Sequence, residues 1–127
     1  MSWINKPKDI SKYQGMVYCI THKESGKYYI GKKFYWFKKT LKPLKGKKNK
    51  RHSLVESDWK NYWGSSNKLL ADVKKFGKRA FKREILEHCE TKFDLAYEEM
   101  KLQVYYDVLN DKNSYNEIIN VRLRKRK

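Results

Sequence analysis

Two tyrosines in a predicted β-hairpin are the first residues of this sequence that could do chemistry. Tyr18 lies in a run from Gly15 to Thr21, and Tyr29 lies in a second run from Lys27 to Gly31. A turn signal, Ser25-Gly26, separates the two runs. Phenols beside positive charge, on a strongly basic chain, suggest chemistry on phosphodiester bonds.

The register of this hairpin decides whether the two phenols act together. If the hairpin centres on Glu24 and Ser25, position 18 lies opposite position 31, and Tyr29 is the diagonal neighbour of Tyr18 on the same face. A slip of one residue would place the two side chains on opposite faces. We expect the shared face.

The net charge of the chain points to a polyanionic partner. The 127 residues carry a formal charge of +17, and 39% of them are hydrophobic, 35% charged and 15% aromatic. We expect one domain with a small core rich in aromatic residues and nucleic acid as its partner. A membrane surface is the competing partner, but the sequence shows no basic amphipathic helix, lipidation signal or spanning apolar run.

The ends and the cysteines of the sequence bear on its compartment. The N-terminus has no signal-peptide core, and Cys19 and Cys89 form no CxxC pair. We expect both cysteines to be buried thiols of a cytoplasmic protein.

Positive charge is concentrated in the first half of the chain. Residues 25–55 contain eleven Lys or Arg and no Asp or Glu. Pro43 and Gly46 indicate a loop, so we predict a basic loop over residues 38–56 that contacts phosphate. The lysines expected to bind nucleic acid are Lys33, Lys38, Lys45, Lys47, Lys48 and Lys50. Trp36, Trp59 and Trp63 are candidates either to stack on bases or to pack in the core.

Residues 84–117 have the opposite charge. They contain nine Asp or Glu and three Lys. In a protein that binds a polyanion, such a segment indicates either an outward helix face that biases docking or a metal ligand.

The elements that position these residues predict a small α+β domain. Strands are expected at about 15–21, 28–31 and 81–88, forming a three-stranded antiparallel sheet flanked by helices. One helix is capped by Ser65 or Ser66 and ends at Gly77, and another begins at Thr91. The second helix is expected to carry one apolar face, formed by Phe93, Tyr97, Met100, Val104 and Val108.

Other segments complete the predicted organisation. Residues 1–14 are expected to form an irregular N-terminal arm, 15–121 the domain, and 122–127 a basic tail. A terminal strand or extended segment is expected over 115–121. His22, in the hairpin turn, is expected to be exposed.

The two tyrosine triplets resemble the signature of the GIY-YIG nuclease superfamily. Met16-Val17-Tyr18 departs from the first triplet at two positions, and Tyr29-Ile30-Gly31 keeps the second intact. The middle of the chain is similar to phage homing-type members at Trp63-Gly64-Ser65-Ser66 and Glu84-Ile85-Leu86, and Tyr115-Asn116 resembles a pair near the end of that domain. The similarity covers about residues 15–120.

The resemblance implies a Mg²⁺- or Mn²⁺-dependent DNA endonuclease. A phage-encoded homing or free-standing nuclease in the host cytoplasm is the corresponding picture. A double-strand break by a domain with one site would require two copies, possible as a homodimer, or two sequential nicks.

The resemblance also implies a role for individual residues. Tyr18 would accept a proton from the attacking water, once nearby cations lower its pKa from about 10. Tyr29 would position the water or the phosphate. Glu99 would hold the divalent cation, with Glu98 as the alternative, and Asn116 would orient the region of Glu99. The lysines available to stabilise the phenolate are Lys27, Lys32 and Lys33.

One position departs from the family pattern. The family carries an arginine eight residues after the second triplet, where this chain has Lys39. Arg51, with His52 beside it, is the rival for that role if residues 38–50 are an insertion. This departure motivates a second hypothesis, a nucleic-acid-binding protein that keeps the fold and lacks strong activity. A third is a basic accessory protein that binds RNA or assembles with partners and whose tyrosines are structural.

Overall fold

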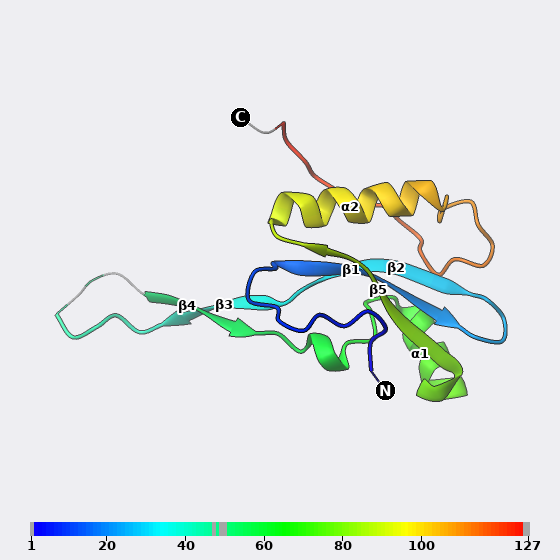
Figure 1. Cartoon of the computed structure of the whole chain (residues 1–127), viewed down its shortest axis with the longest axis horizontal. Helices are drawn as coiled ribbons and strands as arrows, with labels where there is room; N and C mark the ends of the chain where they lie inside the picture. Colours follow the sequence, from blue (N-terminus) through cyan, green and yellow to red (C-terminus); the bar gives the residue numbers. More distant parts are fainter. Residues whose placement is uncertain (1, 47, 49–50, 126–127) are drawn as a thin grey trace.

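The computed structural model describes residues 2–46, 48 and 51–125. Its main sheet has three antiparallel strands in the order β2-β1-β5. The strands are β1 (Gly15–His22), β2 (Tyr28–Phe34) and β5 (Phe81–Cys89). Helices α1 (Asn67–Phe76) and α2 (Lys92–Tyr105) lie on opposite sides of this sheet (Figure 1). The predicted α+β fold with a three-stranded antiparallel sheet is confirmed.

The remaining elements lie between β2 and β5 in the chain. Strands β3 (Trp36–Leu41) and β4 (Arg51–Glu56) pair only with each other in the described sheets. Two short 3₁₀ turns follow, η1 (Trp59–Asn61) and η2 (Lys78–Ala80). No helix in the described ranges has the length and apolar content that crossing a membrane requires.

Strand β1 is hydrophobic on both faces because it is the central strand and both of its faces are covered. On the α1 side, Met16, Tyr18 and Ile20 join the larger core cluster. On the α2 side, Val17 packs with Ile30 in the smaller one. The larger cluster also takes in Trp59 and Trp63, so these two indoles pack in the core.

The predicted register of the hairpin is confirmed. Tyr18 pairs with Gly31, and Tyr29 pairs with Ile20. The rings of Tyr18 and Tyr29 therefore share a face, with centroids 6.2 Å apart.

The local helix signals also act as predicted. The Ser66 side chain accepts a hydrogen bond from the Leu69 amide at the start of α1, and Gly77 ends that helix with φ 87°. Thr91 caps α2 by accepting from the amide of Asp94 at 3.0 Å. Each of these caps satisfies a backbone group that the helix end would leave without a partner.

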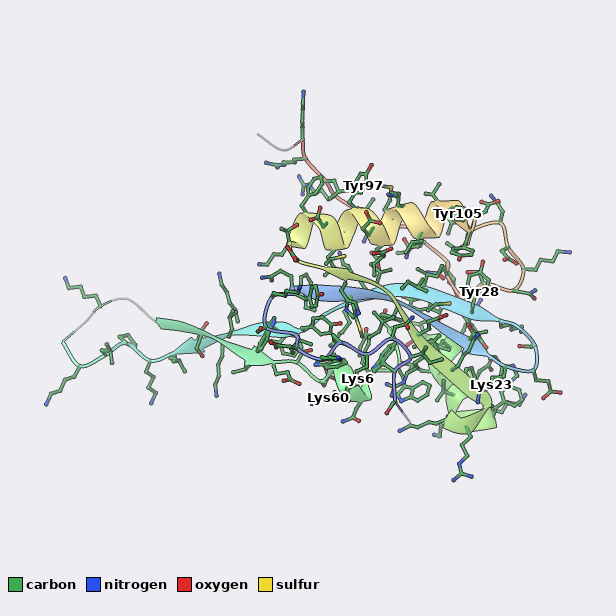
Figure 2. The ribbon with its side chains drawn as sticks, in the orientation of Figure 1. Lys6, Lys23, Tyr28, Lys60, Tyr97 and Tyr105 are labelled. Carbon is green, nitrogen blue, oxygen red and sulfur yellow. The ribbon has the colours of Figure 1, made fainter. Side chains whose placement is uncertain are left out.

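The apolar face of α2 is not the face turned to the sheet, although Val108, beyond the end of the helix, is buried. Tyr97 is 41% exposed and Val104 59% exposed, and Tyr97 points away from the sheet in Figure 2. The face turned to the sheet instead carries Leu95, Glu99 and Gln103, at the spacing of successive helical turns. Two of these three residues are polar, so an apolar pattern could not identify the face.

The two ends of the predicted loop over residues 38–56 form strands instead, and these strands pair as a β-ribbon. Strands β3 and β4 pair from Trp36 opposite Glu56 to Leu41 opposite Arg51. In an exposed strand rich in lysine, apolar and polar residues do not alternate clearly along the sequence. Charged side chains are common on strands that have a free edge. Lys45 and Lys48 lie exposed in the connection, whereas Lys47 and Lys50 lie outside the described residues.

The N-terminal segment is irregular but packs into the domain. Trp3 is 4% exposed, and its indole N–H donates to the Trp59 carbonyl at 2.8 Å. Both backbone groups of Ile4 bond to β5: the amide donates to the Arg83 carbonyl, and the carbonyl accepts from the Ile85 amide. This segment therefore covers the outer edge of β5.

The expectation that His22 is exposed is wrong. Its imidazole is 6% exposed and packs between Phe76 and Phe81, with ring centroids 4.7 and 4.9 Å away. The ring bonds to the Ser25 hydroxyl at 2.6 Å, which closes the hairpin turn. Cys89 is buried as expected, whereas Cys19 is only partly buried.

Replacing Trp3 with alanine should show that the N-terminal segment belongs to the fold. Because a buried indole and its hydrogen bond are lost, we expect the free energy of unfolding to fall by about 3–5 kcal/mol, measured by urea denaturation. Ser2→Ala, at an exposed neighbouring position, is the control and should change it by less than about 0.5 kcal/mol. Equal stability of the two variants would contradict the docking of this segment.

Candidate functional site

The outer edge of β2 organises the candidate site. Because β2 is an edge strand, its backbone groups at Tyr28, Ile30 and Lys32 point away from β1. The Tyr28 amide donates to the Asn113 carbonyl at 2.9 Å, and its carbonyl accepts from the Tyr115 amide at 2.7 Å. The C-terminal segment thus takes the place of a fourth strand for one residue pair.

Asn116 continues this edge with its side chain. Its Oδ1 accepts from the Ile30 amide at 3.0 Å, and its Nδ2 donates to the Ile30 carbonyl at 2.8 Å. Gln103 of α2 donates to the same carbonyl at 3.0 Å. Asn116 therefore ties the C-terminal segment to β2 and, through the shared carbonyl, to the helix that carries Glu99.

Glu99 lies beside Lys32, the next outward-facing residue of the same edge. Its carboxylate lies near the backbone N–H and the ammonium group of Lys32. Burial raises the pKa of Glu99, while the Lys32 charge and its N–H lower that pKa in part. Glu98, the alternative candidate, pairs instead with Lys101 at 3.5 Å. Between the two acids, the structure places Glu99 at the site.

A cavity of about 260 Å³ lies beside this edge. It brings together side chains from β2, α2, the segment before α1 and the C-terminal segment. They are Tyr29, Lys32, Ser65, Glu99, Gln103, Ile118 and Asn120. A phenol, an ammonium group and a carboxylate thus face one space.

The two phenols have different access to this cavity. Tyr29 lines it, and its hydroxyl bonds to the Ser65 hydroxyl at 3.1 Å. Tyr18 is 1% exposed and packs against Trp3 and Tyr62, with ring centroids 5.5 and 5.8 Å away. In this structure Tyr29 is the phenol that a molecule in the cavity can reach.

Glycine at position 31 makes room for the buried phenol. A Cβ at Gly31 would lie 2.6 Å from the Tyr18 hydroxyl and 2.8 Å from the Tyr29 ring. The hydroxyl of Tyr18 thus lies directly over the backbone of β2. The glycine of the second triplet is needed for this close approach, because any side chain would displace one of the tyrosines.

Burial keeps both phenols protonated. It raises the pKa of Tyr18 well above 10, and the neighbouring Tyr62 adds to the rise. Burial also raises the pKa of Tyr29, and the hydrogen bond with Ser65 lowers that pKa in part. The expectation that lysines stabilise a Tyr18 phenolate is therefore not met in the free protein.

The three lysines near the hairpin lie in different surroundings, away from the Tyr18 hydroxyl. Lys33 forms an ion pair with Asp58 at 2.7 Å, and its Nζ lies 4.2 Å from the centre of the Tyr62 ring. Lys32 lines the cavity beside Glu99. Lys27 is exposed at the turn end of the hairpin.

The candidates for the missing arginine lie on the β3–β4 ribbon. Lys39 is exposed on β3 opposite Ser53, and Arg51 pairs through its backbone with Leu41. The side chains of Arg51 and His52 lie outside the described part of the chain. Lys39 does not line the cavity, and the lysine that does is Lys32.

The donor set at the cavity fits a partly hydrated cation. Within the described residues, no group of three or more His, Cys, Asp or Glu could hold a metal. Mg²⁺ is commonly held by one or two carboxylates while it keeps several waters. Glu99 offers one such carboxylate, and about 260 Å³ exceeds the roughly 30 Å³ of a single water several-fold. The site therefore suits Mg²⁺ or Mn²⁺ and does not suit a cation enclosed by protein ligands.

Sequence reasoning missed several residues of the site. Ser65 was considered as a helix cap and as part of a family-like segment, but not as the contact of Tyr29 that it is. Gln103 lies one helical turn after Glu99, and this spacing was a usable signal. Outside the cavity lining, Arg83 and Tyr62 also gave no local signal: Arg83 is buried between Trp3 and Trp63 and donates to the Tyr62 carbonyl at 2.8 Å.

A comparison with known protein families finds a match over most of the chain. The family model described as "Putative endonuclease segE, GIY-YIG domain" matches residues 3–119. No curated protein and no solved structure gives a significant match. The match covers both tyrosines, Glu99 and Asn116, and it includes Trp3. The chain belongs to the GIY-YIG endonuclease-domain family of the segE type.

Proposed function

We propose that this protein is an endonuclease that hydrolyses phosphodiester bonds of DNA with the help of Mg²⁺ or Mn²⁺. The observation that carries the proposal is the cavity at the edge of β2, where Tyr29, Lys32 and Glu99 converge from different elements. Family membership supports nuclease chemistry. The net charge of +17 supports a nucleic acid as the substrate.

Each group at the cavity has a role that its chemistry supports. Glu99 would hold the divalent cation, which when bound stabilises negative charge on phosphorus and on the leaving oxygen. The Lys32 ammonium would contact a non-bridging phosphate oxygen. Asn116 and Gln103 would hold the backbone of β2 so that Lys32 and Tyr29 keep their positions beside Glu99.

The proton acceptor is assigned by access. The family resemblance gives this role to Tyr18 and a positioning role to Tyr29. Burial favours the reverse, because Tyr29 lines the cavity and Tyr18 packs behind it at 1% exposure. We therefore assign the contact with the attacking water to Tyr29, and the support of Tyr29 to Tyr18.

A second function keeps the fold without cleavage. The burial of Tyr18 and the place of Lys39 on the ribbon both favour a protein that binds nucleic acid and cuts weakly or not at all. Cleavage of supercoiled DNA in Mg²⁺, and its absence in EDTA, separates the two functions. A homing or phage role, and a homodimer that would cut both strands, are finer proposals that rest on the resemblance.

Replacing Glu99 with glutamine tests the metal role. Glutamine keeps an oxygen that can accept the Lys32 N–H but removes the charge, so the fold should persist while cleavage of supercoiled DNA in Mg²⁺ falls by about a hundredfold or more. Glu98→Gln, one residue away and outside the cavity lining, should cut within about twofold of the unmodified protein. A Glu99→Gln protein that cuts normally would remove Glu99 from the metal site.

The pH dependence of cleavage tests the phenols. A phenol with a raised pKa is protonated at neutral pH, and its basic form increases about tenfold per pH unit below that pKa. Cleavage at saturating DNA should therefore rise with pH from 7 to at least about 9, and Tyr29→Phe should abolish this rise. Tyr28→Phe is the matched control, since Tyr28 also has a raised pKa but bonds to Asp111 away from the cavity.

The same experiment distinguishes the two tyrosines. If the rise survives in Tyr29→Phe and disappears in Tyr18→Phe, the proton acceptor is Tyr18, as the resemblance implies. If it survives in both variants, neither phenol transfers the proton.

A further inference from the structure

The β3–β4 ribbon is the part of the molecule that the proposed cavity does not use. Its strands pair with each other and not with the main sheet. In Figure 1 the ribbon extends from the body of the molecule, away from α1 and α2. An isolated two-stranded ribbon has little stability of its own and leaves both edges unpaired. Such an element fits a role in contacting a partner.

The charge of the ribbon specifies that partner. The chain has no Asp or Glu between positions 25 and 55. The exposed lysines described in the ribbon and its connection are Lys38, Lys39, Lys42, Lys45 and Lys48. A cationic element of this kind complements the phosphates that border a groove of duplex DNA.

The dimensions of the ribbon fit one groove. Each strand has 6 residues, or about 20 Å at the usual rise of a strand. The major groove of B-DNA, about 12 Å wide, admits a two-stranded β-ribbon, whereas the minor groove is about 6 Å wide.

Strand pairing sorts the ribbon into two faces. Phe37 opposite Val55 and Lys39 opposite Ser53 form one face, which we call the Phe37 face. Lys38 opposite Leu54, with Thr40, forms the other face. Phe37 and Val55 are 45% and 38% exposed, so apolar side chains stand beside polar ones in water.

The Phe37 face is continuous with the tyrosine side of the main sheet. The Nζ of Lys33 lies 5.0 Å from the centre of the Phe37 ring and 4.2 Å from that of the Tyr62 ring. Tyr62 in turn packs against Tyr18. The base of the Phe37 face is therefore joined through Lys33 and Tyr62 to the core that holds Tyr18.

We propose that the β3–β4 ribbon enters the major groove of duplex DNA, with the Phe37 face against the base edges. Lys39 and Ser53 supply hydrogen bonds to bases, and Phe37 and Val55 contact thymine methyl groups. Lysines outside this face contact phosphates. The inference rests on the proposed function in one respect: the duplex that the ribbon reads is the duplex that the cavity cuts.

Two matched variants of the full chain test the reading face. Lys39→Gln with Ser53→Ala alters the Phe37 face, and Lys38→Gln with Thr40→Ala removes the same charge from the opposite face. Each protein is mixed with a library of random duplexes in EDTA, and the bound duplexes are sequenced. Both variants should bind total DNA severalfold more weakly in low salt, because each loses one cation.

Only the change on the Phe37 face should alter the bases selected. We expect its enrichment of preferred bases to fall about tenfold or more at two or more positions, while the opposite-face variant keeps the preference of the unmodified protein. The inference is overturned if the unmodified protein selects no bases, if both variants keep its preference, or if only the opposite-face variant loses it. Circular dichroism confirms that both variants are folded.

A second measurement tests the groove. In the preferred duplex, replacing purines by 7-deazapurines removes N7 acceptors that are present only in the major groove. We expect binding to weaken about tenfold, and unchanged binding would overturn the placement in the major groove. Neither measurement requires cleavage, so a protein that selects bases but cuts no DNA in Mg²⁺ supports the ribbon inference and contradicts the proposed function.

Discussion

The free edge of β2 is the constraint on which the rest of the structure depends. Backbone groups on a partly buried edge must find partners, because each group left without one costs about 1–3 kcal/mol. Two outward-facing residues in alternation, Tyr28 and Ile30, are satisfied by different means, and the Glu99 carboxylate lies beside the third, Lys32. The two means are the backbone of the C-terminal segment and the Asn116 amide. Glu99 and Gln103, which reach this edge from α2, also line the candidate cavity.

This constraint explains the orientation of α2. A helix positioned only by hydrophobic burial would turn Tyr97 and Val104 inward. Here Glu99 and Gln103 must reach β2, so the apolar stripe lies largely in solvent and Leu95 supplies the buried contact. The helix gives up apolar burial to satisfy the edge. The result is a carboxylate beside a cavity and an adjacent phenol, the arrangement expected where chemistry takes place.

The ribbon is joined to the body through a few aromatic and polar contacts at its base. The Trp36 indole donates to the Tyr13 carbonyl at 3.0 Å, and Ser57 bonds back to the Phe34 carbonyl at 2.6 Å. Lys33 then bridges the Phe37 and Tyr62 rings. Anchored at one end only, the ribbon can present both faces to a partner.

The sequence by itself determined the features that depend on near neighbours in the chain. The caps at Ser66 and Thr91, the stop at Gly77 and the register of the hairpin follow from local backbone chemistry, and so the α+β fold and the shared face of Tyr18 and Tyr29 were predictable. Glu99 and Asn116 were identified through resemblance to a family, and no local pattern pointed to them.

Only the tertiary structure decided which face of α2 is buried, how deeply Tyr18 lies and where Lys39 stands. These depend on contacts between residues far apart in the chain, such as Trp3 with Trp59 and Asn116 with Ile30. A hydrophobic pattern cannot show that a polar helix face is required, because the requirement comes from the unpaired edge of a strand more than sixty residues away, as the bond from Gln103 to Ile30 shows.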